Sequence, residues 1–209
     1  EILLPKRANA DELALDQLDL FSFGLLQRGV ATDLIVELGD PRLREHAKPV
    51  DLSRISDVLP IAQAMREWMD KRGGVGIAAP QIGVGLQMMI IASRPNPRYP
   101  DAPQMQPLLL LNPLPLRYSD STVEEWEGCL SVPGLRGKVR RPDAVEIEYF
   151  DAAGKGHQLA LSGFPARIFQ HEYDHLIGKT FVDRVATPQD LVSEKVFLEQ
   201  ILPARLASK

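Results

Sequence analysis

Residues 167–179 read RIFQHEYDHLIGK and carry two histidines and a glutamate in the pattern H-E-x-x-H. Residues four apart in an α-helix lie one turn apart on the same face, so His171 and His175 are expected to point the same way. Glu172 would lie beside them, close enough to hold a water on a bound metal. Burying two imidazoles and a carboxylate on an otherwise apolar helix is costly unless a cation or polar partners satisfy them. The stretch therefore predicts a metal-binding helix in the core of the protein.

A catalytic metal centre of this type needs three protein ligands and an open position, so a third ligand must lie elsewhere. The longer pattern H-E-x-x-H-x-x-G-x-x-H fails because its last position is Phe181. One candidate is Glu194 on a later predicted helix, with Glu199 close by, although both glutamates also suit a solvated helix face. Cys129 is the other, in the glycine-flanked turn EGCLSVPG (residues 127–134), and a thiolate suits a borderline-soft dication. A free cysteine is often only a small buried hydrophobe, but its pairing with H-E-x-x-H favours Cys129.

The chain around this helix predicts a sheet-rich domain. Pro165 is expected to open the helix and Gly178 to end it. Alternating residues on both sides of DAAGKG (residues 151–156) predict a hairpin. TPQD (residues 187–190) resembles a capping box, so a last helix is expected between it and Pro203. The other expected elements are helices over residues 11–28 and 57–71 and strands over residues 86–93, 108–113, 121–128, 144–150 and 157–163.

This order of elements indicates an α+β fold, with mostly antiparallel sheets packed around a central metal-binding helix and with helices at both termini. We expect three parts: an N-terminal helical extension over residues 1–32, a catalytic domain over residues 33–185, and a C-terminal helix and tail over residues 186–209.

The composition is that of an ordinary soluble globular protein. The chain has 209 residues, of which 44% are hydrophobic and 25% charged, and a net charge of -4, which argues against non-specific nucleic-acid binding. No apolar run approaches the ~20 residues that cross a bilayer, and the first residues do not resemble a secretory signal. Cys129 is the single cysteine, which excludes an internal disulfide and suits a reducing compartment.

Three separated stretches resemble motifs of the peptide deformylase family, and they occur in the family's order. GVGIAAPQ (residues 74–81) resembles the family's G-x-G-x-A-A-x-Q, and it is followed by EGCLS (residues 127–131) and QHEYDH (residues 170–175). The resemblance covers about residues 35–185. It implies hydrolysis of the formyl group from the N-terminal formyl-methionine of new polypeptides, with release of formate.

The resemblance also implies a role for each motif residue. Glu172 would be the general base, and the side-chain amide of Gln81 and the backbone N–H of Leu130 would stabilise the negative oxygen of the intermediate. A water would take the open position on the metal. The family's usual metal is Fe²⁺, with Zn²⁺ or another divalent ion in some members. The implied metal ligands are Cys129, His171 and His175.

Further positions match the family's substrate pocket. Val75, Phe164 and Ile168 match residues that line it, although each also suits an ordinary core position. Gly76 would allow the extended substrate to approach the backbone closely, as an added strand. Arg136 matches an arginine that borders the cleft, but RGKVRR (residues 136–141) equally suits a solvated basic turn.

Two rival functions remain open at this point. One is a zinc endopeptidase with Glu194 as third ligand, and the other is a non-catalytic peptide-binding module whose structural metal would need a fourth ligand. The expected partners of a deformylase are formyl-methionyl nascent peptides, and the activity would suit contact with the ribosome. The expected location is the bacterial cytoplasm, or an organellar matrix or stroma if a transit peptide has been trimmed.

Overall fold

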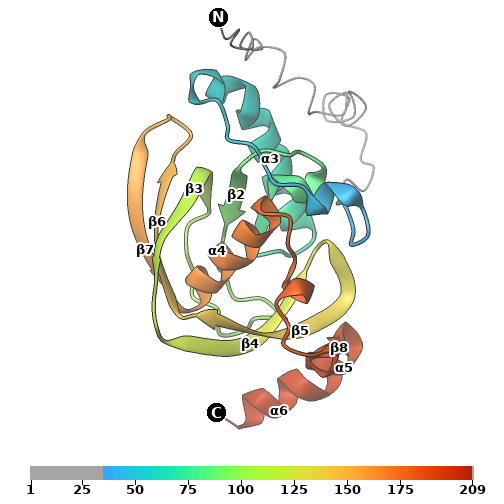
Figure 1. Ribbon diagram of the computed structural model, residues 1–209. Coiled ribbons are helices and arrows are strands. Elements are labelled where there is room, and N and C mark those ends of the chain that lie inside the picture. The colour runs from blue at the N-terminus through green and yellow to red at the C-terminus, as the bar shows by residue number, and fades with distance from the viewer. Residues whose placement is uncertain (1–34, 209) are drawn as a thin grey trace, which may run out of the picture.

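The protein consists of two antiparallel sheets with a helix between them (Figure 1), in a computed structural model that describes residues 35–208. The helix expected over residues 11–28 lies outside these residues. One sheet has the strand order β1-β2-β3-β6-β7 and the other the order β4-β5-β8. The strands are β1 (Gly76–Ala78), β2 (Met88–Ile91), β3 (Leu108–Tyr118), β4 (Thr122–Cys129), β5 (Val132–Pro142), β6 (Ala144–Phe150), β7 (Gly156–Ser162) and β8 (Leu191–Ser193).

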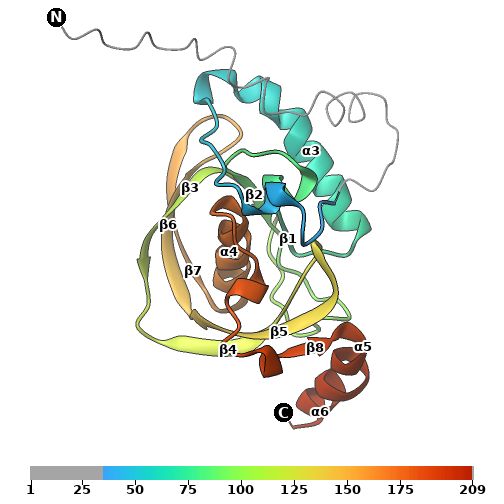
Figure 2. The same ribbon diagram turned by 45° about the vertical axis from the view of Figure 1, so that its right-hand side comes forward.

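Helix α4 (Gly163–Leu176) is the helix that H-E-x-x-H predicted, and it lies at the centre of the molecule in both views (Figures 1 and 2). It packs against strands of both sheets. Its Ile168 and Phe169 are buried in one cluster with Met89 and Ile91 of β2. The helix ends just before Gly178, whose positive φ of 69° is a conformation that glycine adopts without strain. The predicted α+β fold around a central helix is therefore confirmed.

Helix α3 (Ile55–Lys71) covers the other face of the five-stranded sheet. Side chains of a strand alternate between faces, so Met88 and Ile90 pack on the α3 side while their neighbours pack on α4. Both faces of β2 are thus buried. The structure contains the helix expected over residues 57–71 and the hairpin of residues 144–150 and 157–163. It also contains the strands expected over residues 86–93, 108–113 and 121–128. Strand β3 extends beyond the expected end to Tyr118, with two register shifts in its pairing with β6.

The most important difference from the sequence-based expectation is β5. A turn was expected over residues 127–134 and a solvated basic turn was left open for residues 136–141, but β5 pairs with β4 along its length and with β8 near its start. The solvated basic turn considered for residues 136–141 is wrong, since Arg136 and Arg141 are buried. The sequence does not suggest a buried strand here, because arginine is rarely buried unless its charge is paired.

The C-terminal segment also differs. TPQD forms only one 3-10 turn, Pro188–Asp190, and the helical stretch begins at Glu194 as α5 (Glu194–Val196). It continues through a π-helical turn, Phe197–Ile201, into α6 (Leu202–Ala207). The expected end before Pro203 is wrong, because the π-helical turn places Pro203 in the first turn of α6, where its missing N–H needs no partner. No helix within residues 35–208 is long and apolar enough to span a membrane.

Candidate metal centre and substrate cleft

The structure brings Cys129 together with His171 and His175. Their ligand atoms all lie within 4.8 Å of one another, and Cys129 Sγ is 3.2 Å from His175 Nε2. The histidines come from α4 and the cysteine from the end of β4. A thiolate and two imidazoles form a donor set that suits a borderline-soft divalent ion. Within residues 35–208 this is the single cluster of this kind.

The other candidate ligand lies apart from this cluster. The Glu194 carboxylate accepts a hydrogen bond of 2.8 Å from Arg136 Nη2, and it is not part of the ligand group. Phe181 is fully buried and packs near the His171 ring, with 6.3 Å between the ring centroids. The geometry therefore favours Cys129 as the third ligand.

Glu127 orients the His171 ring from the side that faces away from the ligand cluster. Glu127 Oε2 lies 2.9 Å from His171 Nδ1, which directs the other ring nitrogen toward the ligand cluster. Two arginines bind the same carboxylate, Arg141 through Nε at 2.6 Å and Arg167 through Nη1 at 2.7 Å. Burial raises the pKa of Glu127, but the charge of Arg141 and the hydrogen bonds of His171 and Arg141 outweigh it and hold the pKa far below its usual range. Glu127 is thus a buried carboxylate that stays ionised.

The two histidines differ in their protonation. Burial opposes the charged form of His171, but the hydrogen bonds that its ring donates to Cys129 and Glu127 raise its pKa well above the usual value. For His175, burial and the nearby charge of His171 both lower the pKa well below the usual value. Burial and charge thus shift the two ring pKa values in opposite directions, which favours the charged form of His171 and the neutral form of His175.

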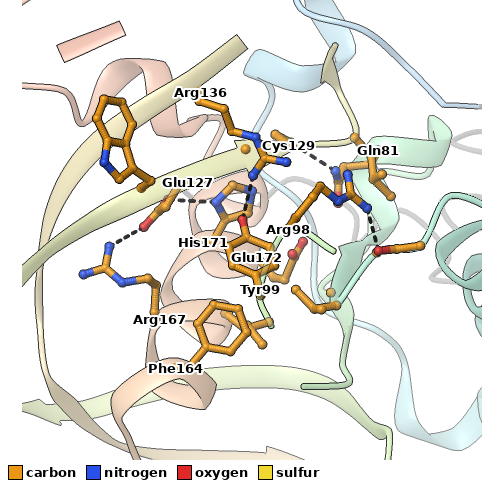
Figure 3. Close-up of a pocket in the computed structure, with 18 residues that line it drawn as sticks. Gln81, Arg98, Tyr99, Glu127, Cys129, Arg136, Phe164, Arg167, His171 and Glu172 are labelled. Atoms are coloured by element: carbon orange, nitrogen blue, oxygen red, sulfur yellow. Dashed lines mark hydrogen bonds and ion pairs between the residues drawn. The ribbon is translucent and has the colours of Figure 1, made fainter. Parts of the chain in front are cut away.

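Glu172 faces the cleft beside the candidate ligands Cys129 and His171 (Figure 3). It is buried, its Oε2 has no hydrogen-bond partner within the described part of the chain, and burial raises its pKa to about 7. Gly76 makes room for it, since a Cβ at this position would lie 2.4 Å from Glu172 Oε1 and 2.7 Å from Ile168 Cγ2. This close approach is the physical reason for a glycine in the first motif.

Gln81 is held so that its amide nitrogen faces the cluster. It lies in the 3-10 turn Ala79–Ile82, and its Oε1 accepts a 2.8 Å hydrogen bond from the backbone N–H of Ala78. Its Nε2 therefore points to Cys129 Sγ, at 3.4 Å, and to Ser131 Oγ, at 3.3 Å. Leu130 lines the same cleft directly after Cys129. Both residues expected to supply donors are thus beside the cluster.

The predicted pocket residues also line the cleft, which has a volume of about 50 Å³. Val75, Gly76, Phe164 and Ile168 form part of its wall. Arg136 lies there too, with its side chain 2% exposed, and donates to the Tyr99 hydroxyl at 3.0 Å. The site residues expected from the sequence therefore all line one cleft, except His175, which is fully buried and joins the site through its contact with Cys129.

Several cleft residues were missed in the sequence. Tyr99 and Arg98 come from an irregular loop, and Trp126 and Arg167 carry no motif signal. Arg141 was missed because it reaches Glu127 only through the pairing of β5 with β4. A pattern search could have found Arg141 only after identifying β5 as a strand.

Comparison with known proteins places this geometry in a family. A family model described as polypeptide deformylase matches residues 32–190. Peptide deformylase 2 of Nostoc sp. is 44% identical over 167 residues, which cover 80% of this chain and 93% of that protein. Peptide deformylase 1 of Bordetella pertussis is 44% identical over 151 residues, which cover 72% of this chain and 86% of that protein.

Solved structures of peptide deformylases have a fold similar to that of this chain. The Met-Ala-Ser-bound crystal structure of a class I type b peptide deformylase from Acinetobacter baumannii superposes with a TM-score of 0.71 at 43% identity, covering 72% of this chain and 96% of that chain. A peptide deformylase from Synechococcus elongatus in complex with actinonin gives a TM-score of 0.67 at 37% identity, covering 77% of this chain and 83% of that chain. The sequence match, the shared fold and the Cys-His-His cluster together show that this chain belongs to the peptide deformylase family.

Proposed function

We propose that this protein hydrolyses the formyl amide at the N-terminal formyl-methionine of newly made polypeptides and releases formate. The observation that carries the proposal is the Glu172 carboxylate, whose Oε2 has no hydrogen-bond partner among residues 35–208 and which is buried beside the Cys-His-His cluster at the wall of a small cleft. Family membership supports the same reaction. The relative from Acinetobacter baumannii was crystallised with Met-Ala-Ser, which has the free N-terminal methionine that deformylation would leave.

Cys129, His171 and His175 would hold one divalent ion, with Fe²⁺ as our first choice and Zn²⁺ or another divalent ion as the alternative. Such an ion lowers the pKa of a bound water from 15.7 to about 7 and so supplies a nucleophile at neutral pH. Glu127 supports this centre by fixing the ring of His171 through a 2.9 Å contact. The ligand types do not select the metal, because cellular availability also decides it.

Glu172 is the proposed proton carrier. Its carboxylate accepts the proton of the attacking water and returns it to the departing peptide amine, which a single group can do because the two steps are sequential. Its Oε2 is available for this role because it makes no hydrogen bond within the described residues. Because Gly76 has no side chain, it leaves room for the Glu172 carboxylate.

Gln81 and Leu130 are the proposed donors to the formyl oxygen. The hydrogen bond from Ala78 to Gln81 Oε1 fixes the amide so that Nε2 is the group that faces the cleft. The backbone N–H of Leu130 follows directly after the ligand Cys129. Loss of one such donor typically lowers turnover by ~10²- to 10³-fold.

The methionine side chain is proposed to lie against Val75, Phe164 and Ile168, with the substrate backbone alongside Gly76. Arg136 borders this space, but its two terminal nitrogens already bind Tyr99 and Glu194. We therefore assign it to shaping the cleft wall around Tyr99.

The proposed substrate also indicates where in the cell the enzyme acts. Formyl-methionyl chains occur where translation begins with formyl-methionine, so we place the enzyme in the bacterial cytoplasm, or in an organellar matrix or stroma, near the ribosome. The relatives from Nostoc and Bordetella are bacterial proteins.

One experiment separates this function from the endopeptidase and the non-catalytic module. Full-length protein is loaded anaerobically with Fe²⁺ and incubated with formyl-Met-Ala-Ser and with acetyl-Met-Ala-Ser, and the products are identified by mass spectrometry. We expect formate and intact Met-Ala-Ser from the first peptide and much slower release from the second, because the small cleft leaves little room for an added methyl. Cleavage between Met and Ala would support the endopeptidase, and no product from either peptide would support the non-catalytic module.

A further inference from the structure

Arg136 is buried against the backbone that precedes the candidate ligand Cys129. Its side chain is only 2% exposed. A Cβ at Gly128 would lie 2.5 Å from both Cζ and Nη1 of Arg136, so the guanidinium group lies directly against the Gly128 backbone. Figure 3 shows this group next to Cys129. Arg136 therefore contacts the residue immediately before the thiol ligand.

The strand pairing does not fix Gly128. The register of β4 and β5 shifts between Glu127 and Cys129, and in the described part of the sheet Gly128 has no paired residue. At such an irregularity the regular hydrogen bonds of the ladder are interrupted, so other contacts must fix the backbone. The Arg136 guanidinium group occupies the space beside Gly128. Its position should therefore influence where Cys129 lies.

The C-terminal helical stretch holds this guanidinium group. Glu194 Oε1 accepts a 2.8 Å hydrogen bond from Arg136 Nη2, and the Phe197 ring centroid lies 5.2 Å from Cζ, within the range of a cation–π contact. Glu194 and Phe197 are three residues apart, so they face the same side of the helical stretch. Nη1 donates to the Tyr99 hydroxyl at 3.0 Å. Within residues 35–208, Glu194 is the single carboxylate that pairs with Arg136.

The pairing of β5 with β8 places Glu194 beside Arg136. Leu135 of β5 pairs with Ser193 of β8, and Glu194 follows directly as the first residue of α5. The Ser193 hydroxyl accepts a hydrogen bond from the backbone N–H of Val196 and so caps α5. The start of α5 is therefore fixed to the strand that carries the arginine.

Building on the proposed function, we propose that Glu194 is a positioning residue. Through Arg136 it fixes the backbone at Gly128 and so sets the position of Cys129 Sγ at the metal centre. Loss of the carboxylate would leave the Arg136 charge buried without its counter-charge, which favours movement of the guanidinium group away from Gly128. Glu194 lies beyond residues 32–190, the region that the family model matches, so this support comes from the C-terminal segment.

The first test is the visible absorption of the full-length protein loaded with Co²⁺, because the bands of a cobalt–thiolate centre depend on the ligand geometry. Glu194→Ala is expected to shift these bands. Glu194→Gln keeps an oxygen that can accept the hydrogen bond from Arg136 and should retain the wild-type spectrum. Glu199→Ala is the matched control, because Glu199 is exposed on the same helical stretch and does not pair with Arg136.

The second test measures kcat and KM for formyl-Met-Ala-Ser, with each rate expressed per bound metal. We expect Glu194→Ala to lower kcat by about tenfold, the lower end of the effect of losing a group that orients a metal ligand. KM should stay near the wild-type value, since the substrate contacts remain. Glu194→Gln and Glu199→Ala should both keep the wild-type kcat. A role in folding alone would lower the yield of metal-loaded protein without changing kcat per metal.

A wild-type cobalt spectrum or a wild-type kcat for Glu194→Ala would overturn the inference. Absence of formate from the metal-loaded wild type would instead reject the proposed function. In that case the cobalt spectra would still decide whether Glu194 positions Cys129.

Discussion

At the scale of single residues, Glu127 supports the proposed metal site from behind the Cys129, His171 and His175 cluster. Its carboxylate contacts His171, Arg141 and Arg167, all of which are buried. Removing its charge frees the His171 ring and leaves two guanidinium groups with one partner fewer. The site is thus built from a ligand shell and a buried ion-pair network behind it.

We predict that Glu127→Gln weakens metal affinity by about 10- to 100-fold, the usual effect of losing a group that orients a metal-bound histidine. The measurement is metal retention against a competing chelator, with the folded state checked by circular dichroism. Glu125→Gln is the control, because Glu125 lies on the same strand but pairs with Arg205. Equal metal retention in both variants would contradict this role.

Gly76 gives a second prediction at this scale. Because a Cβ would lie 2.4 Å from Glu172 Oε1, Gly76→Ala should displace the carboxylate and lower kcat by ~10²-fold, the effect that a misplacement of about 1 Å can produce. Metal content should stay at the wild-type level. Gly156→Ala is the control, since its Cβ would make only an ordinary 3.5 Å contact. Wild-type turnover in Gly76→Ala would show that Glu172 need not occupy this position.

At the scale of elements, the sequence predicts local structure well and long-range pairing poorly. Helix α4, the 144–150 and 157–163 hairpin and the ligand-bearing turn all follow from patterns within about twenty residues. Strand β5 does not, because its buried arginines are stabilised by carboxylates of distant elements. Arg141 pairs with carboxylates of β4 and α4, and Arg136 pairs with Glu194 of α5. The role of Arg141 can be predicted only when it is known that β4 and α4 lie next to β5.

Arg141 connects the second sheet to the central helix, since it binds Glu127 of β4 and Asp174 of α4. Arg141→Ala leaves both carboxylates buried without this cation, so we predict a loss of about 3–5 kcal/mol in the free energy of unfolding. Urea denaturation of the metal-free protein measures it. Arg140→Ala, at a side chain that is 65% exposed, should change stability by no more than about 0.5 kcal/mol. Similar midpoints for the two variants would contradict the structural role of Arg141.

At the scale of the whole molecule, the sequence predicts the fold class from the order of its elements. It also predicts the Cys129, His171 and His175 cluster and the position of Glu172, because these rest on local motifs. It does not predict the strand order, which depends on contacts between distant segments. Nor does it reveal that Glu194 pairs with Arg136, a residue 58 positions earlier in the chain. The division into parts at residues 32 and 185 stays a prediction, although β8 joins the second sheet from beyond the later limit.

The central claim is that Glu172 acts on a substrate held at the Cys129, His171 and His175 centre. It is tested most directly by formate release from formyl-Met-Ala, comparing wild type with Glu172→Gln at equal measured metal content. We predict steady release by the wild type and a loss of at least ~10²-fold in kcat for the variant, since general acid–base catalysis contributes about that much. Equal rates from the two proteins, or no formate from the metal-loaded wild type, would contradict the mechanism.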